Sequence, residues 1–232
     1  MVEICKICGA QVRKIYVEKV DAHYFVCDFC EFIFKDPKAY LSEKEEFTRY
    51  EEHNNTIEDP RYVAYFKDFI DKAIIPFQKG GKKAFDFGSG PSPVLAMILE
   101  RDYKYQTEIY DYFYAPEKVY EGKTYDLVTS TEVFEHLADP LGYFTLLAGL
   151  MKDDAILAIM TQFHPNNDKV FENWFYKSDP THISFFTPKT MASMAKIAGF
   201  KIIYCDHKKN ITFTNTKDIL DNSEEGGLKD GN

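Results

Sequence analysis

The chain has 232 residues, 45% of them hydrophobic, and a formal net charge of −9. This length allows one medium-sized domain with a small appendage, and the apolar content is enough for a packed core, which excludes a globally disordered chain. The excess of acidic residues makes nucleic acid an unlikely partner, because phosphate backbones are bound mainly through positive charge.

No apolar run approaches the roughly 18 residues that a membrane-spanning helix needs. The first ten residues, MVEICKICGA, lack the basic and apolar segments of a signal peptide. We therefore expect a cytoplasmic protein with no membrane partner.

Four of the five cysteines form two Cys-x2-Cys pairs separated by an 18-residue spacer. Two residues between paired cysteines let one tight turn direct both sulfurs at the same ion, so this spacing is typical of a tetrathiolate zinc site. A disulfide pair and a redox dithiol are alternatives, which a reducing cytoplasm and the lack of a thioredoxin-like context disfavour. With β-prone segments at 12–17 and 24–26, residues 1–38 are predicted to form a zinc ribbon. The predicted Zn²⁺ ligands are Cys5, Cys8, Cys27 and Cys30.

Residues 39–80 are predicted to be a helical linker. Residues 41–53 are charged and helix-prone. After Asp59-Pro60, apolar residues recur at helical spacing as far as Ile74, which predicts a helix over residues 60–76. We expect this helix to cover one face of a sheet.

The segment 83–99 combines a short apolar strand, a Gly-Ser-Gly turn and the start of a helix. Gly88 and Gly90 allow positive φ and close approach of a ligand to the backbone. Ser92 followed by Pro93 matches an N-cap with proline at the first helical position, which predicts a helix over residues 93–101. The positive end of that helix would favour an anionic or carboxylate-bearing ligand.

Further strands and helices alternate after this turn. Asp111 stands at the end of a predicted strand, 21 residues beyond Gly90, where folds of this kind place an acid on ribose hydroxyls. The gap 112–124 is too short for a helix and another strand in full. This order predicts an α/β fold with a doubly wound, mostly parallel sheet and a ligand at the carboxyl ends of the first strands. The predicted strands are 106–110, 125–130, 155–160, 200–205 and 211–214, and the predicted helices are 140–150 and 188–198.

These motifs together resemble the class I S-adenosylmethionine (SAM) dependent methyltransferases of the methyltransferase 23 type, over about residues 83–201. The resemblance rests on DFGSG at 86–90, Asp111, YDLV at 125–128, EVFEHL at 132–137 and DPTHISFF at 179–186, which leads to AGF at 198–200. A dinucleotide dehydrogenase is the competing hypothesis, but it requires a small residue at the position of Pro93.

The resemblance implies a SAM-binding methyltransferase domain over residues 81–217, followed by a polar tail at 218–232. Segments before the first strand often line the pocket mouth in this family, which implies such a role for Arg49-Tyr50 and His53-Asn54. Tyr112 and Phe113 are the candidates for stacking beside the adenine. The implied cofactor-binding residues are Asp86, Gly88, Ser89, Gly90, Asp111, Tyr112, Phe113, Thr131 and Glu132.

Methyl transfer from a sulfonium needs a positioned nucleophile and, in some cases, removal of its proton. His182, in a short loop between Asp179-Pro180 and the predicted helix at 188, is the candidate base, with an unperturbed pKa near 6.5. His164, after the strand at 155–160, is a second candidate. For both histidines a structural role is the alternative, and His136 is expected to be a packing residue at a helix start.

The order of ribbon and methyltransferase domain is also similar to deoxysugar C-methyltransferases, in which a loop Glu-His pair abstracts a proton. His182 matches that histidine, and Thr181 stands at the position of the acid. We predict a SAM-dependent methyltransferase with a small-molecule substrate. The alternatives are an RNA or protein methyltransferase that uses the ribbon for recognition, and a non-catalytic SAM-binding protein. The sequence leaves open the acceptor, the C-, N- or O-chemistry and the oligomeric state.

Overall fold

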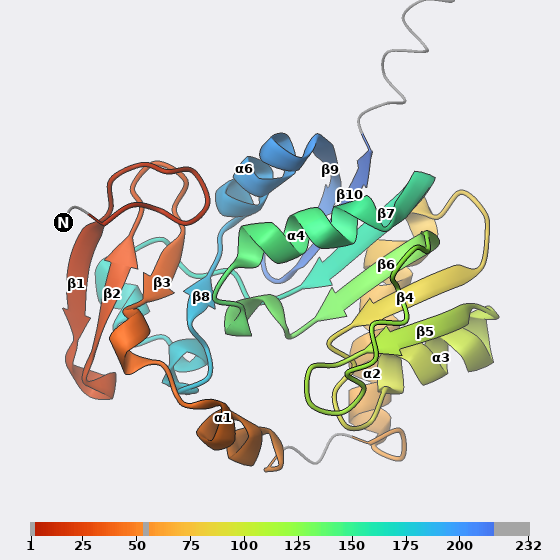
Figure 1. Ribbon diagram of the computed structural model, residues 1–232, viewed down its shortest axis with the longest axis horizontal. Coiled ribbons are helices and arrows are strands. Elements are labelled where there is room, and N and C mark those ends of the chain that lie inside the picture. The colour runs from red at the N-terminus through yellow and green to blue at the C-terminus, as the bar shows by residue number, and fades with distance from the viewer. Residues whose placement is uncertain (1–2, 53–55, 216–232) are drawn as a thin grey trace, which may run out of the picture.

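A computed structural model describes residues 3–52 and 56–215 of the chain. It contains a six-stranded sheet covered by helices on both faces and a smaller four-stranded sheet at the N-terminal end (Figure 1). No helix in these two ranges is long and apolar enough to cross a membrane. The hypothesis for His53-Asn54 and the predicted tail at 218–232 concern positions outside the described residues.

The large sheet has the strand order β5-β4-β6-β7-β10-β9. Strands β5, β4, β6 and β7 are parallel, whereas β10 is antiparallel to both of its neighbours. The predicted α/β fold with a mostly parallel sheet is therefore confirmed. The bounds are Lys83–Phe87 for β4, Gln106–Tyr110 for β5, Tyr125–Thr131 for β6, Met151–Met160 for β7, Phe200–Cys205 for β9 and Asn210–Asn215 for β10.

Helices α2 (Pro60–Phe69) and α3 (Val94–Tyr103) cover one face of this sheet, and α4 (Pro140–Gly149) and α6 (Pro188–Ala198) cover the other. Neighbouring side chains of β6 point to opposite faces of the sheet. Leu127 packs in the cluster that contains the α2 and α3 side chains. Val128 packs in the cluster that contains those of α4 and α6. The central strands are thus buried on both faces, as is typical of parallel strands between two layers of helices.

In the helical linker, the starts of the two helices agree with the sequence, whereas the second helix is shorter than predicted. Ser42 forms a capping box at α1 (Glu43–Tyr50), and the Asp59 side chain caps α2 ahead of Pro60. The predicted helix over 60–76 is α-helical only as far as Phe69. A π-turn at Ile70–Ile74 and a 3₁₀ turn at Ile75–Phe77 follow, and proline at position 76 accounts for the end because it has no N–H to donate.

The predicted N-cap at Ser92 is wrong. Helix α3 begins at Val94 with Pro93 as its N-cap and no side-chain cap bond. Pro93 has φ −78° and ψ 60°, and the Val94 N–H donates to the Ser92 carbonyl oxygen at 2.8 Å, which is the geometry of an inverse γ-turn. The Val94 N–H thus has a partner within this turn. The predicted cap would instead have used the Ser92 hydroxyl as the acceptor for the first N–H groups of the helix.

The small sheet joins two distant parts of the chain. Its strands are β1 (Arg13–Val17), β2 (Ala22–Val26), β3 (Ile33–Lys35) and β8 (Ser184–Phe185), in that order. The last strand pairs antiparallel with β3 across Ile33↔Phe185 and Phe34↔Ser184. The segment that carries His182 is therefore attached on one side to the N-terminal strands β1 to β3, which are called the ribbon below, and on the other side to α6 (Figure 1).

The remaining short elements connect these layers. Residues 112–124 contain no helix or strand, in agreement with the short gap in the sequence, apart from an isolated bridge between Asp111 and Ala115. The short elements are η1 (Glu18–Val20), η2 (Pro37–Ala39), η5 (Phe134–His136), α5 (Asp168–Phe171) and η6 (Phe175–Ser178).

Candidate active site

The glycine turn, residues 88–90, leaves the end of β4 with two residues in the left-handed region. Gly88 has φ +82°, and a Cβ at this position would lie 2.2 Å from Cγ2 of Val133. Its N–H donates to the Tyr110 carbonyl oxygen at 2.8 Å, which ties the turn to the end of β5. Gly90 has φ +66°, and a Cβ there would meet nothing within 4 Å. Glycine is thus required at both positions by conformation, and at Gly88 also by packing.

Asp111 reaches this turn from the end of β5. One carboxylate oxygen accepts the Gly90 N–H at 2.8 Å, and the other accepts the N–H groups of Phe113 and Tyr114 at 3.0 and 3.1 Å. The carboxylate therefore holds the glycine turn and the loop after β5 together.

A cavity of roughly 1070 Å³ lies over the carboxyl ends of β4, β5 and β6. This volume is at the upper limit of small-molecule sites, which typically measure about 300–1000 Å³. Residues of α1 and α2 cover it from the other side, among them Tyr50 and Tyr65. All nine sequence-predicted cofactor residues line it: Asp86, Gly88, Ser89, Gly90, Asp111, Tyr112, Phe113, Thr131 and Glu132.

The part of the cavity beside the glycine turn has polar groups suited to a ligand. The Ser89 Oγ is buried and has no hydrogen-bond partner among the described residues. The carboxyl group of Asp86 accepts from Thr129 Oγ1 at 2.8 Å, but burial raises the pKa of Asp86 to about 7. An unsatisfied hydroxyl and a buried carboxyl group fit a polar ligand such as an amino acid moiety, because the hydroxyl would gain the partner that it lacks and the carboxyl group a further one.

The loop after β5 carries the two residues predicted to stack on adenine. Phe113 lines the cavity and packs against the rings of Phe47 and Tyr50 from α1, with centroid distances of 5.3 and 5.6 Å. Tyr112 is 60% exposed, and its hydroxyl donates to Glu43 at 3.2 Å. Helix α1 therefore closes over this loop, and Phe113 is the more enclosed of the two rings.

The end of β6 carries a cluster of two carboxyl and two phenol groups. Glu132 accepts from the hydroxyls of Tyr65 and Tyr176, at 2.6 and 2.9 Å. Glu135 is fully buried and accepts from Thr161 Oγ1 at 2.8 Å and from the same Tyr176 hydroxyl. Burial and the neighbouring charge of Glu135 raise the pKa of Glu132 to about 7, and burial raises the pKa of Glu135.

Of these four residues the sequence predicted only Glu132. Glu132 itself has φ +55°, a conformation that costs a non-glycine residue about 1–3 kcal/mol and is enriched at functional sites. The signal in the sequence was the Glu-x-x-Glu-His run directly after a strand. Tyr65 and Tyr176 carry no comparable signal, because they reach the cluster from α2 and η6.

His182 lies on the cavity wall next to His136. The two rings are 4.8 Å apart between centroids. The Nδ1 of His182 lies 2.6 Å from the Tyr176 carbonyl oxygen, which can only accept, so Nδ1 carries the proton and Nε2 the lone pair. Burial and then the neighbouring His136 lower the pKa of His182 from the unperturbed value near 6.5 to about 4. His136, expected to be a packing residue, packs edge-on against the rings of Tyr50 and His182 and also lines the cavity.

His164 does not reach the cavity. It is 4% exposed, and both ring nitrogens are hydrogen-bonded. Its Nε2 donates to the Glu31 carbonyl oxygen at 2.7 Å, while its Nδ1 accepts the Asn166 N–H at 3.1 Å. Burial lowers the pKa of His164 to about 4. These contacts place His164 as a link between the ribbon and the segment after β7, and they give it no path to a substrate.

Arg49 and Tyr50 were proposed from the sequence to line the mouth of the cofactor pocket, and the structure places both near the cavity. Tyr50 lines it, and Arg49 forms an ion pair with Asp179, a lining residue, at 3.2 Å. Helix α1 is therefore tied to the loop that carries His182.

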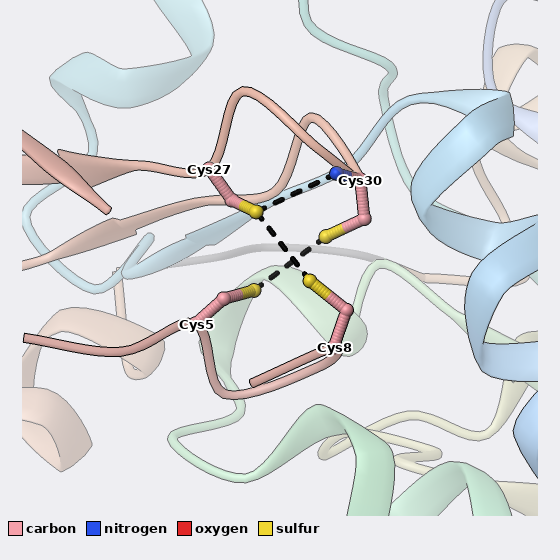
Figure 2. Close-up of side chains that lie close together, drawn as sticks. All are labelled: Cys5, Cys8, Cys27 and Cys30. Carbon is pink, nitrogen blue, oxygen red and sulfur yellow. Dashed lines mark hydrogen bonds between the residues drawn. The ribbon is translucent and has the colours of Figure 1, made fainter. Parts of the chain in front are cut away.

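The four ribbon cysteines converge from two loops (Figure 2). The Sγ atoms of Cys5 and Cys30 are 3.5 Å apart, as are those of Cys8 and Cys27, and all four lie within 4.8 Å of one another. A tetrahedral zinc ion with Zn–S bonds of about 2.3 Å holds its sulfurs about 3.8 Å apart. The chemistry and spacing of this donor set therefore fit one Zn²⁺ ion, and all four cysteines are free thiols in the structure.

The two cysteine loops are built alike. The Gly9 N–H donates to the Cys5 carbonyl oxygen at 3.0 Å, and the Glu31 N–H donates to the Cys27 carbonyl oxygen at 2.8 Å. Gly9 and Glu31 have φ +73° and +66°. The second loop thus adopts the left-handed turn without glycine.

Comparison with known proteins agrees with this geometry. A family model described as a methyltransferase domain matches residues 58–204, more than half of the chain. The ubiquinone biosynthesis O-methyltransferase of Dinoroseobacter shibae is 30% identical over 125 residues, which cover 50% of this chain and 46% of that protein. The chain thus spans about half the length of this curated relative.

Among solved structures, that of the mitomycin 7-O-methyltransferase MmcR has a TM-score of 0.52 at 12% identity. The match covers 68% of this chain and 59% of that one, and it shows a likeness of fold alone. With a glycine turn and an acidic residue at the ends of adjacent parallel strands, and with a family model matched across them, the chain belongs to the methyltransferase-domain family.

Proposed function

We propose that this protein is a SAM-dependent methyltransferase that acts on a small-molecule acceptor. The observation that carries the proposal is the cavity, which gathers the glycine turn, Asp111 and the cluster at the end of β6. Ser89 and Asp86 would hold the amino acid part of SAM, Asp111 its ribose, and Phe113 its adenine. When bound, SAM supplies the electrophilic methyl group.

The charge of the cavity supports a cationic cofactor. Among the described residues that line it, nine are acidic and Arg61 is the one arginine or lysine. A negative field attracts a sulfonium and repels a polyanion, which also favours a small acceptor over RNA. The acidic residues are Glu43, Glu46, Asp59, Asp86, Asp111, Glu132, Glu135, Asp139 and Asp179.

The acceptor side of the cavity is formed by the cluster at the end of β6 and by His182. The likeness to an O-methyltransferase supports an oxygen nucleophile. His182 acts on that nucleophile in our proposal, because it lines the cavity with its Nε2 lone pair available to a polar group. The Thr181 hydroxyl donates to Asp179 at 2.6 Å, so the acid of the deoxysugar C-methyltransferases has no equivalent at this position.

The ribbon binds one structural Zn²⁺ in this proposal. Four thiolates leave no open position for water, so the ion would stabilise the fold without taking part in methyl transfer. The ribbon would thereby support the loop of His182, since β8 continues the ribbon sheet.

Turnover with a panel of acceptors tests the proposal. The full chain is incubated with SAM and with phenols, catechols and hydroxy acids, and formation of S-adenosylhomocysteine is measured. Formation with at least one acceptor is the expected result. A protein that binds SAM but yields no product with any small molecule, and instead methylates RNA or protein, would overturn the small-molecule assignment.

A further inference from the structure

We propose that Arg49 is a positioning residue that couples the two halves of the cavity. It connects helix α1, which packs on the loop after β5, to the turn that carries His182. The inference rests on the proposed function, in which the loop after β5 holds the adenine and His182 faces the acceptor. A bound cofactor would then order the acceptor side of the cavity through α1.

Helix α1 is held on the loop after β5 by side-chain contacts at the surface. None of the eight residues of α1, all of which the structure describes, is buried. Phe47 and Tyr50 pack against the ring of Phe113 with centroid distances of 5.3 and 5.6 Å. The Tyr112 hydroxyl donates to Glu43 at 3.2 Å. An adenine stacked on Phe113 would restrict this ring and so favour the position of α1 that the structure shows.

Arg49 lies in the last turn of α1 and reaches the turn that carries His182. Its Nε and Nη2 donate to Oδ2 of Asp179 at 3.3 and 3.2 Å, and its Nη1 donates to Glu52. The side chain of Asp179 is 16% exposed and that of Arg49 is 38% exposed. Water therefore screens this ion pair less than it screens one on the open surface.

The second carboxylate oxygen of Asp179 holds the turn itself. Oδ1 accepts the Thr181 N–H at 3.0 Å and the Thr181 hydroxyl at 2.6 Å. The His182 N–H donates to the Asp179 carbonyl oxygen at 3.1 Å. Burial raises the pKa of Asp179, but the hydrogen bonds from Thr181 and nearby positive charge together lower it to about 2. The ionised carboxylate thus serves Arg49 and the turn at once, and its rotation would move His182.

Other contacts hold the neighbouring segment without α1. The Lys35 Nζ donates to the Pro180 carbonyl oxygen at 3.1 Å, and the Ile183 N–H donates to the Glu135 carbonyl oxygen at 2.8 Å. These bonds would persist without Arg49. Loss of Arg49 should therefore loosen the turn at 179–182 and leave the chain around it folded.

Hydrogen exchange of backbone amides, resolved by residue, tests the inference on the full, zinc-replete chain without an acceptor. In the ligand-free chain, Arg49→Gln should quicken exchange at Thr181 and His182 by roughly two- to fivefold, because a partly exposed ion pair stabilises only modestly. The Ile183 N–H is the internal reference and should exchange at an unchanged rate.

S-adenosylhomocysteine provides the second comparison. In the unmodified chain it should slow exchange at Thr181 and His182 at least twofold. This effect should be lost in Arg49→Gln although the variant still binds S-adenosylhomocysteine, since coupling between two sites requires an element that both of them bias.

Two further variants separate coupling from a general loss of charge. Arg49→Lys keeps the positive charge but not the planar fork of donors, and it should restore part of the slowing. Arg101→Gln is the matched control, because Arg101 on α3 pairs with its neighbour Asp102, and it should behave as the unmodified chain does.

Unchanged exchange at Thr181 and His182 in ligand-free Arg49→Gln would overturn the inference, as would equal slowing by S-adenosylhomocysteine in this variant and in the unmodified chain. A tenfold loss of affinity for S-adenosylhomocysteine in Arg49→Gln would place Arg49 in the cofactor site and also overturn it. Absence of binding to the unmodified chain would instead refute the proposed function, while the ligand-free comparison would still decide whether Arg49 positions the turn.

Discussion

The backbone N–H of Gly90 donates to a carboxylate oxygen of Asp111 at 2.8 Å, across 21 residues of sequence. The bond connects the ends of two adjacent parallel strands, β4 and β5. It fixes the glycine turn in the cavity wall before any ligand binds, so the cofactor would meet a surface that is already ordered.

Gly90→Ala tests the role of this turn. The new Cβ would enter open space in the cavity wall at φ +66°, so the substitution combines backbone strain of about 1 kcal/mol with loss of room for a ligand. We expect the affinity for S-adenosylhomocysteine to fall tenfold or more, because overpacking costs about 1–3 kcal/mol. Gly122→Ala is the control, with φ +73° and open space at a position that does not line the cavity. Equal loss of affinity in both variants would speak against a cofactor at Gly90.

Cys27→Ser tests the ribbon. Removal of one thiolate leaves three, and we expect the chain to lose its zinc ion and to melt at a lower temperature, because a structural zinc site contributes directly to folding. The measurements are zinc per chain by elemental analysis and thermal unfolding. Cys205→Ser removes the cysteine outside the cluster and should keep one zinc per chain. A Cys27→Ser protein with full zinc content would contradict the four-thiolate site.

His182→Ala tests the acceptor side of the cavity. Turnover with the best acceptor should fall by about a hundredfold or more, while the affinity for S-adenosylhomocysteine stays nearly unchanged. This separation is expected because His182 packs beside His136 and Tyr176 and is not one of the residues proposed to hold the cofactor. Normal turnover would return His182 to a structural role.

His164 should make stability depend on pH. Its pKa is lowered by burial to about 4, from about 6.5 in an unfolded chain. A group of this kind stabilises the fold above pH 6.5, and this contribution, roughly 3 kcal/mol, is lost as the pH falls from about 6.5 to about 4. We expect the free energy of unfolding to decline over this window and His164→Gln to show a shallower decline. An unchanged slope in the variant would show that other groups cause it.

The strands of the large sheet could be predicted along the chain because each is a short segment rich in apolar and β-prone residues that ends in a turn. The side chains of Asp59, Asp139 and Thr187 cap α2, α4 and α6, and each of them directly precedes a proline, which is a local sequence pattern. Ser92 also precedes a proline, but its side chain does not cap α3, since the γ-turn at Pro93 already gives the Val94 N–H a partner. Strand β8 was not predicted, because two residues carry no periodic signal and pair only through the position of the ribbon.

The cofactor side of the cavity was predictable in the same way. Its residues follow directly from strand ends, and parallel strands bring their carboxyl ends to one edge. The acceptor side was only partly predictable, because Tyr65 and Tyr176 come from elements whose placement is tertiary. His164 and His182 have similar sequence contexts. Only their burial and hydrogen bonds show that His164 links the ribbon to the segment after β7, whereas His182 lines the cavity.

Calorimetric titration of the full, zinc-replete chain with S-adenosylhomocysteine tests the central claim most directly. We predict one molecule bound per chain, with weaker binding by Asp111→Asn and unchanged binding by Asp154→Asn, an exposed aspartate away from the cavity. Absence of binding to the folded, zinc-containing chain would contradict the assignment of this cavity to SAM.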